Sequence, residues 1–376
     1  MNILHINPGR AFGGGERHVL ELVAALAARG HRLHVAAAAD GALARRLRDS
    51  GISHTLHPVV ARQALDVGAM RRLAALLERH RIDILHAHYA RDYPVAAGAV
   101  RWRRWRGKLA PALFLTRHHY APLTRSRLYR WWLGVTERLI AVSGYVGGKA
   151  RASLGWDDAR VVVIPNWVDA ERFRLPPGVD RQSCRQRFGL PEGAFVVGCL
   201  NRLEANKGQA TLLSALEAAQ GLAPRLHLAL AGSADTDYLD KLRRQADAAG
   251  LTAQVSFLGF VEDAPGFLAA CDAVAIPSLD EAFSLGALEA WAAGAPVAVS
   301  DAGGLAELVA HEETGLRVAP LDPGAWADAL RRLAGDADLR RRLAEGGRRA
   351  VRRYAPERAV AAVEALYRAA LTRHQW

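Results

Sequence analysis

Arg202 and Lys207 stand five residues apart, directly after an apolar run at 195–200 that is typical of a strand. Gly208 then begins a helical pattern. A guanidinium can hold phosphate oxygens through two parallel hydrogen bonds, and an ammonium can hold them as a point charge. Loops that lead from a strand into a helix also bind anions. The pair could therefore hold a diphosphate, although an isolated pair of this kind is usually a solvated basic loop.

A second group of polar residues occupies segment 277–289, again between a strand-like run and a helical pattern. On a single helix Glu281 and Glu289 would be about 12 Å apart along the axis, so Glu281 is better placed on the loop. There it could face a sugar hydroxyl, while Glu289 could accept ribose hydroxyls. The backbone N–H groups that could meet phosphate at the helix start belong to Phe283, Ser284 and Leu285. Helix capping and surface charge remain the alternative explanation of the glutamates.

Three consecutive glycines, Gly13, Gly14 and Gly15, lie between the first strand-like run and the first helical pattern. Because glycine has no Cβ, this loop can approach a ligand closely. The sequence has neither the G-x-G-x-x-G fingerprint nor the G-x-x-x-x-G-K-[ST] phosphate loop. Dinucleotide binding and nucleotide hydrolysis are therefore weak candidates.

Several histidines stand near predicted strand ends: His5, His86, His88, His118 and His119. They could suggest zinc, but no acidic or thiol side chain accompanies them at metal spacing. The triplet at 235–237, Asp-Thr-Asp, is expected to cap a helix, because acidic residues stabilise a helix N-terminus. We therefore expect no metal site and no cofactor.

Short apolar runs alternate with helical patterns along most of the chain, which is typical of parallel, doubly wound sheets. The predicted strands are 3–7, 34–39, 84–88, 113–116, 139–142, 161–164, 195–200, 226–231, 255–258, 273–276 and 297–300. The Pro-Pro-Gly region at 174–180 interrupts the alternation and indicates a linker. We expect an α/β protein of two Rossmann-like domains, 1–174 and 175–355, facing across a cleft. A C-terminal helix, 356–376, is expected to pack on the first domain. Ligands of such sheets bind beyond the carboxyl ends of the strands.

The 376 residues include three cysteines, none in a C-x-x-C pair or at a zinc spacing, which suits a reducing compartment. The first residues do not resemble a signal peptide, and no apolar run approaches the roughly 18 residues of a membrane span. We expect a cytoplasmic protein that could lie on the inner face of the membrane. The net charge of +12 indicates an anionic partner: nucleic acid, an acidic membrane or a phosphorylated substrate.

The order and spacing of the motifs resemble those of the retaining GT-B glycosyltransferases of family 4, over nearly the whole chain. The matching motifs are G-G-G-E-R-H at 13–18, H-x-H at 86–88, T-R-H at 116–118, A-V-S at 141–143, I-P-N-W-V-D at 164–169, Arg202 with Lys207 and Gly208, the pair Glu281 and Glu289, and Gly303 and Gly304 with Glu307. The departures are Asn201, Ala282, Ser284 and Trp167, where the family has glycine, and Trp291, where it has methionine. None removes a charged group, so they bear on the identity of the donor sugar.

The resemblance implies that Arg202 and Lys207 hold the diphosphate of a nucleotide-sugar donor. It also implies that Glu289 binds the ribose and that Glu281 orients the transferred sugar. The implied transfer retains the anomeric configuration and requires no metal, with cations stabilising the departing diphosphate. A UDP-sugar is the expected donor, and the expected acceptor is a cell-envelope glycan or a lipid-linked sugar such as the lipopolysaccharide core.

The resemblance further makes His118 the active-site histidine, with His119 as the competing assignment. Gly14 and Gly15 would lie against the phosphate or the acceptor. Two hypotheses of other kinds are a non-catalytic basic protein that binds nucleic acid or membrane, and a GT-B-fold sugar-nucleotide epimerase. Because no recognised nucleic-acid motif is present, we expect no nucleic-acid partner.

Tryptophan and arginine are mixed in the segment that contains Trp102, Arg103, Arg104 and Trp105, and again around 125–132. This mixture is typical of a helix that lies on an anionic membrane surface. The alternative is a pair of solvated amphipathic helices with half-buried aromatic rings.

Overall fold

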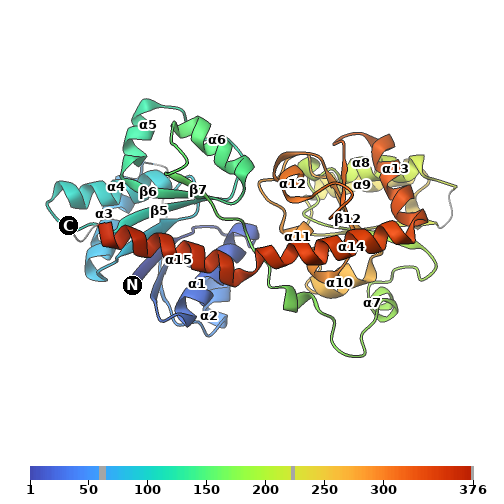
Figure 1. Ribbon diagram of the computed structural model, residues 1–376, viewed down its shortest axis with the longest axis horizontal. Helices are drawn as coiled ribbons and strands as arrows, with labels where there is room; N and C mark the ends of the chain where they lie inside the picture. The colour runs from blue at the N-terminus through green and yellow to red at the C-terminus, as the bar shows by residue number, and fades with distance from the viewer. Residues whose placement is uncertain (59–64, 222–224, 374–376) are drawn as a thin grey trace. The chain divides into compact units, whose positions relative to one another are not determined.

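The computed structural model describes residues 1–58, 65–221 and 225–373, and the chain divides into two compact units (Figure 1). Unit 1 comprises Met1–Asn166 and Glu357–Trp376, and unit 2 comprises Trp167–Pro356. The expected boundary after residue 174 therefore falls inside unit 2. The reason is that Phe173 is buried in the core of unit 2, and that the Val168 N–H donates to the Tyr354 carbonyl.

Among the described residues, unit 1 has a seven-stranded parallel sheet of order β3-β2-β1-β4-β5-β6-β7. Its strands are β1 (Asn2–Ile6), β2 (Arg32–Ala36), β3 (Thr55–His57), β4 (Ile84–Ala87), β5 (Ala112–Arg117), β6 (Thr136–Ala141) and β7 (Val161–Val163). β1 is an interior strand of the sheet, where Ile3 pairs with Leu33 on one side and with Ile84 on the other. The strand order reverses between β1 and β4, and ligands of such sheets bind at that reversal.

The helices of unit 1 connect these strands and cover the sheet. They are α1 (Gly14–Ala28), α2 (Ala42–Asp49), α3 (Val67–Arg79), α4 (Tyr93–Trp105), α5 (Arg127–Trp132), α6 (Gly144–Leu154) and α15 (Pro356–Arg373). Local sequence sets their ends. For example, the Ser143 hydroxyl accepts a hydrogen bond from the Val146 N–H at the start of α6, and Gly155 ends that helix in a left-handed conformation.

The C-terminal helix α15 lies beside α1 within unit 1 (Figure 1). Its Glu364 carboxylate accepts a hydrogen bond from Arg29 at the end of α1, at 2.8 Å. Its Tyr367 side chain is fully buried, and the hydroxyl lies 2.5 Å from His86 Nδ1 at the centre of the sheet. The end of the chain therefore contributes to the core of unit 1.

Among the described residues, unit 2 has a six-stranded parallel sheet of order β10-β9-β8-β11-β12-β13. Its strands are β8 (Phe195–Leu200), β9 (Leu226–Ala231), β10 (Val255–Gly259), β11 (Ala273–Ile276), β12 (Val297–Ser300) and β13 (Leu316–Val318). Its helices are α7 (Arg181–Arg187), α8 (Gln209–Ala218), α9 (Thr236–Ala248), α10 (Ala264–Ala270), α11 (Leu285–Ala293), α12 (Gly303–Leu308), α13 (Pro323–Gly335) and α14 (Ala337–Val351). Short 3-10 turns of the chain are Leu133–Val135, Ala170–Phe173, Ala205–Lys207, Thr252–Gln254 and Arg352–Tyr354.

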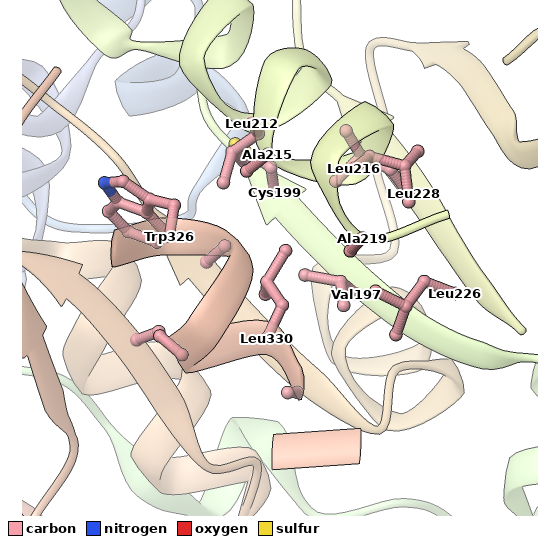
Figure 2. Close-up of a cluster of buried hydrophobic side chains, with 14 of the residues drawn as sticks. Val197, Cys199, Leu212, Ala215, Leu216, Ala219, Leu226, Leu228, Trp326 and Leu330 are labelled. Atoms are coloured by element: carbon pink, nitrogen blue, oxygen red, sulfur yellow. The ribbon is translucent and has the colours of Figure 1, made fainter. Parts of the chain in front are cut away.

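The core of unit 2 follows from the alternation of side chains along β8. Val197 and Cys199 point to one face of the sheet, where they pack with residues of α8 and with Trp326 and Leu330 of α13 (Figure 2). Val196, between them in sequence, belongs to the cluster on the other face. β8 is apolar throughout because both of its faces are buried. The packing on both faces also fixes the position at which the strand ends.

Two predicted features are confirmed. Both units are parallel-sheet α/β structures, and Asp235 caps α9 by accepting hydrogen bonds from the Asp237 and Tyr238 N–H groups. Within the described residues, no helix combines the length and the apolar character that crossing a bilayer requires.

Candidate active site

The loop between β8 and α8 carries both predicted phosphate-binding cations, but in different surroundings. Lys207 ends the 3-10 turn and is buried, and its Nζ donates to Glu281 Oε1 at 2.7 Å. Arg202 lies at the surface, with 64% of its side chain exposed, and forms an ion pair with Glu204. The structure therefore brings Lys207 and Glu281 together and leaves Arg202 in solvent.

Gly208 allows this loop to pack against the loop that follows β11. Its φ is +73°, and a Cβ at this position would lie 2.1 Å from the Pro277 carbonyl oxygen. The Leu279 N–H also donates to the Asn206 carbonyl at 2.9 Å. A side chain at Gly208 would separate the two loops, and with them Lys207 from Glu281.

Glu281 lies on the loop before α11, as predicted, and its carboxylate is held from two sides. Lys207 donates to Oε1, and the Ser278 hydroxyl donates to the same oxygen at 2.9 Å. Asn201 Nδ2 lies 3.4 Å from the Ser278 hydroxyl, so the residue after β8 also takes part. Ser278 was not assigned a role from the sequence, because no spacing rule shows that it contacts Glu281.

The start of α12 supports this loop from another side. The Gly304 N–H donates to the Glu281 carbonyl at 2.7 Å, and a Cβ on Gly303 would lie 2.4 Å from Asp280 Oδ1. Gly303 has a φ of +53°, which favours glycine. The two glycines of the family motif therefore fix the backbone that carries Glu281.

At the start of α11, Ser284 is the capping residue, and its hydroxyl accepts a hydrogen bond from the Ala287 N–H at 3.2 Å. Glu281 is therefore not the cap of this helix. Glu289 lies further along α11 and is buried, with 8% of the residue exposed. The predicted phosphate-facing N–H groups of Phe283, Ser284 and Leu285 lie at this helix start.

In unit 1, the first turn of α1 and the loops after β4 and β5 bring Gly15, His88 and His118 close together. A Cβ on Gly15 would lie 3.9 Å from the His118 ring, and His88 Nδ1 lies 3.4 Å from His118 Nε2. The His18 ring on α1 packs edge-on to His118, with centroids 4.6 Å apart. His119 is exposed and its Nδ1 accepts a hydrogen bond from the Ala121 N–H, so the structure places His118 in this cluster.

Burial keeps these histidines neutral at pH 7. Loss of solvation lowers the pKa of His18 to about 4, although its hydrogen bond to Asn166 acts in the opposite direction. Burial also lowers the pKa of His118 well below its usual value, with further contributions from His18 and Arg117. A neutral imidazole can donate and accept a hydrogen bond at once.

The loop at Gly14 is closed by Glu16, whose carboxylate accepts hydrogen bonds from the Gly13 N–H at 3.0 Å and from the Tyr89 hydroxyl at 2.6 Å. Gly14 is exposed at the first turn of α1. Glu16 therefore fixes the backbone of this loop. The sequence motif contains Glu16 but does not predict these contacts.

Asp92 is a further residue that the sequence did not identify. It precedes α4 and is 1% exposed, and within the described residues neither of its carboxylate oxygens has a hydrogen-bond partner. Burial raises the pKa of Asp92 to about 7, against the opposing effect of Arg91. An acid just before the helix that follows the H-x-H strand was the available signal, and carboxyls with raised pKa values occur often at functional sites.

Among the described residues of unit 1, two groups of histidines could hold a metal ion: His5 with His86 and His88, and His18 with His88 and His118. Within each group, one ring nitrogen of each residue lies within 4.8 Å of the others. In unit 2, the described contacts join one cation, Lys207, to one carboxylate, Glu281, and Glu289 is a second buried carboxylate, on α11.

Comparison with known proteins assigns the chain to a family. A family model described as glycosyl transferases group 1 matches residues 180–350, and one described as glycosyltransferase family 4 matches residues 12–172. D-inositol 3-phosphate glycosyltransferase of Salinispora arenicola is 31% identical over 334 residues, which cover 81% of this chain and 72% of that protein.

Comparison with solved structures leads to the same assignment. Anabaena Alr3699/HepE, solved in complex with UDP and glucose, has a TM-score of 0.82 and 26% identity, with 97% of this chain and 98% of that chain covered. WaaG, a glycosyltransferase involved in lipopolysaccharide biosynthesis, shares the fold at 19% identity, with a TM-score of 0.72 over 95% of this chain and 98% of that one. The chain therefore belongs to the glycosyl transferases of group 1 and is a glycosyltransferase with the GT-B fold.

Proposed function

We propose that this enzyme transfers a sugar, with retention of configuration, from a UDP-sugar to a cell-envelope glycan or a lipid-linked acceptor such as the lipopolysaccharide core. The observation that carries the proposal is the buried pair of Lys207 and Glu281, built by the loops after β8 and β11. The HepE structure with UDP and glucose supports the donor class. The name of WaaG agrees with an envelope acceptor, and the name of the Salinispora relative indicates a phosphorylated acceptor.

In the proposed reaction, Lys207 exchanges its partner Glu281 for the donor diphosphate. The bond from the anomeric carbon to the phosphate oxygen breaks, and the acceptor hydroxyl bonds to that carbon on the same face. The acceptor proton passes to the departing phosphate. Because Lys207 is buried, its charge is poorly screened and stabilises the negative charge that develops on the leaving group.

The remaining residues have supporting roles in this scheme. Glu281, once released from Lys207, accepts a hydrogen bond from a hydroxyl of the transferred sugar. Glu289 accepts hydrogen bonds from the ribose hydroxyls. Arg202 is exposed and can turn from Glu204 to the phosphate. His118 contacts the transferred sugar as a neutral imidazole. The transfer requires no metal, because the cationic side chains supply the positive charge.

Lys207→Ala tests this function. The variant should lose turnover by a factor of about 10²–10³, which is the loss that follows removal of one group stabilising transition-state charge. Turnover would be measured as UDP release from a panel of UDP-sugars in the presence of an envelope acceptor extract. Lys241→Ala removes an exposed lysine of α9 in the same unit and should keep full activity.

Binding would be followed separately by thermal shift with UDP, ADP and GDP. UDP should raise the melting temperature of the wild type and of Lys241→Ala, and less that of Lys207→Ala. Full turnover of a folded Lys207→Ala variant would contradict the role of Lys207. If no nucleotide or nucleotide sugar shifts the wild-type melting temperature, the donor site itself is wrong.

We also propose that unit 1 contacts an anionic membrane, where a lipid-linked acceptor would be found. Trp105, Leu109, Leu128 and Trp131 are exposed apolar side chains of the α4 and α5 region. The Arg101 guanidinium lies 4.0 Å from the centre of the Trp131 ring. Exposed tryptophans beside basic side chains suit the interface of an acidic bilayer.

Two of the four residues predicted for this surface do not lie freely on it. Arg103 is buried, and it donates to the Leu109 carbonyl at 2.8 Å and to Glu78 at 3.2 Å. Trp102 is half-buried beneath Arg71. The helix turns Arg103 toward α3, so Arg104 and Trp105 are the exposed members of the motif.

A further inference from the structure

Three histidines of unit 1 meet at the carboxyl end of its sheet. His18 lies on α1, His88 follows β4 and His118 follows β5. One ring nitrogen of each lies within 4.8 Å of the others. His88 Nδ1 and His118 Nε2 are 3.4 Å apart. In a tetrahedral site with Zn–N bonds of 2.0–2.1 Å, ligand nitrogens are about 3.3–3.4 Å apart, so this pair already has the spacing of two metal ligands.

Neighbouring groups orient two of the three rings. His18 Nδ1 lies 3.0 Å from the Asn166 side-chain oxygen, which can only accept. The proton of His18 is therefore on Nδ1, and Nε2 carries the lone pair. His88 uses its other nitrogen, Nε2, in a hydrogen bond of 3.0 Å with His5 Nδ1. Metal-binding histidines commonly have their second nitrogen held in this way.

The second group of histidines is less suited to an ion. Both nitrogens of His86 already have partners, Tyr367 at 2.5 Å and Thr116 at 2.7 Å. An ion at His5, His86 and His88 would have to break one of these contacts. His88 belongs to both groups, so one ion at most can use it.

The site is partly open to solvent at one of its three ligands. His18 and His88 are buried, whereas His118 is partly exposed, so an ion can reach the nitrogens past His118.

We propose that His18, His88 and His118 bind one divalent transition-metal ion, of the Zn²⁺, Co²⁺ and Ni²⁺ class, and that the bound ion inhibits sugar transfer. Three imidazole nitrogens and one water would complete a tetrahedral site. The inhibition rests on the proposed function, because it requires His118 to contact the transferred sugar. The binding of the ion does not depend on that function.

The experiment is a Co²⁺ titration of the tag-free, metal-free enzyme, followed by visible absorption and by calorimetry with Zn²⁺. The wild type should show the strong visible bands of tetrahedral Co²⁺, saturating near one ion per chain. His18→Gln should weaken binding at least tenfold. His118→Gln, at the partly exposed position, should do the same and serves if His18→Gln does not fold. Melting curves would establish the folding of each variant.

His57→Gln is the matched control. His57 belongs to a different cluster with His34 and His80, whose rings lie 5.4 and 4.9 Å from it, and it should keep wild-type Co²⁺ binding. No saturable tetrahedral band in the wild type would overturn the site. Equal binding by the wild type, His18→Gln and His118→Gln would also overturn it, since only scattered histidines would then hold the ion.

An activity measurement separates the two parts of the proposal. Zn²⁺ should inhibit the wild type at the concentration that fills the site, and a chelator should restore activity. Saturable binding without inhibition would overturn the inhibitory role and argue against contact between His118 and the sugar. A metal-free enzyme inactive with every donor would count against the proposed function, while the Co²⁺ result would still decide the site.

Discussion

Lys207 and Arg202 carry the same charge on the same loop, yet the structure gives them different properties. Lys207 is shielded from solvent with Glu281, where Coulomb interactions are strong. Arg202 is solvated beside Glu204, in an ion pair of the kind that contributes little. Without a donor, Glu281 neutralises Lys207. In the proposed reaction, the donor diphosphate would replace Glu281 as the partner of Lys207.

This pair predicts coupled stabilities in the donor-free enzyme. Lys207→Met should lower the free energy of unfolding by about 2–3 kcal/mol, because it leaves the Glu281 carboxylate without its cation. This loss is somewhat smaller than the loss expected for a fully buried ion pair. Lys207→Met with Glu281→Gln should recover much of that loss. Urea unfolding of the wild type, both single variants and the double variant measures the coupling. Losses that simply add would show that the two side chains do not stabilise each other.

At this scale, the sequence predicted which residues carry charge but not which residues touch. Lys207 and Glu281 were both placed on loops after strands, as found. Their contact spans 74 residues, and so depends on the pairing of β8 with β11. Ser278 and Asp92 were missed for the same reason. A hydroxyl that orients a carboxylate and an acid whose burial raises its pKa are both products of tertiary structure.

Among the elements, strands buried on both faces were predicted best. β8, β9, β11 and β12 have the same bounds as the predicted runs at 195–200, 226–231, 273–276 and 297–300. β3 and β13 were missed. Each is three residues long and pairs with one neighbour, β2 or β12, at the edge of its sheet. So short a segment shows little periodicity, and the adjacent strand determines its conformation.

The helix α15 is held to unit 1 by Glu364, whose carboxylate accepts hydrogen bonds from three side chains. The donors are Arg368 at 2.6 Å, Arg29 at 2.8 Å and His31 at 2.9 Å. The hydrogen bond from Arg368, with those from Arg29 and His31, lowers the pKa of Glu364 to about 2, although partial burial acts in the opposite direction.

Glu364→Gln should therefore destabilise the protein in a pH-dependent way. Because the folded-state pKa is depressed, the charged carboxylate contributes its full stability above about pH 4.5, and this contribution is lost as the pH falls toward 2. The free energies of unfolding of the wild type and of Glu364→Gln, measured in urea, should differ by a constant amount from pH 7 down to about pH 5. Below about pH 5 the two values should converge. A difference independent of pH down to pH 3 would contradict the assignment.

For the whole molecule, the net charge of +12 favours approach to any anionic surface. In the proposed membrane contact, the exposed tryptophans of unit 1 are the side chains that would enter the interface. Trp105→Ser with Trp131→Ser should weaken binding to vesicles that contain phosphatidylglycerol about tenfold or more. Because the attraction is partly electrostatic, salt at about 0.5 M should weaken wild-type binding as well.

The control for this prediction is Phe260→Ser, which removes an equally exposed aromatic side chain from unit 2. It should bind the vesicles as the wild type does, and neutral vesicles should bind all three proteins weakly. Sedimentation with vesicles measures each case. Unchanged binding of the double variant would favour solvated helices at α4 and α5.

The contact between Tyr367 and His86 joins residues that lie 281 positions apart in the chain. Unit 2 is continuous in sequence, so its folding requires no distant segment, whereas we expect unit 1 to complete its core only once α15 is present. The histidines packed around His86 therefore take their final positions only after synthesis of α15, so a truncated product would lack an ordered centre in unit 1.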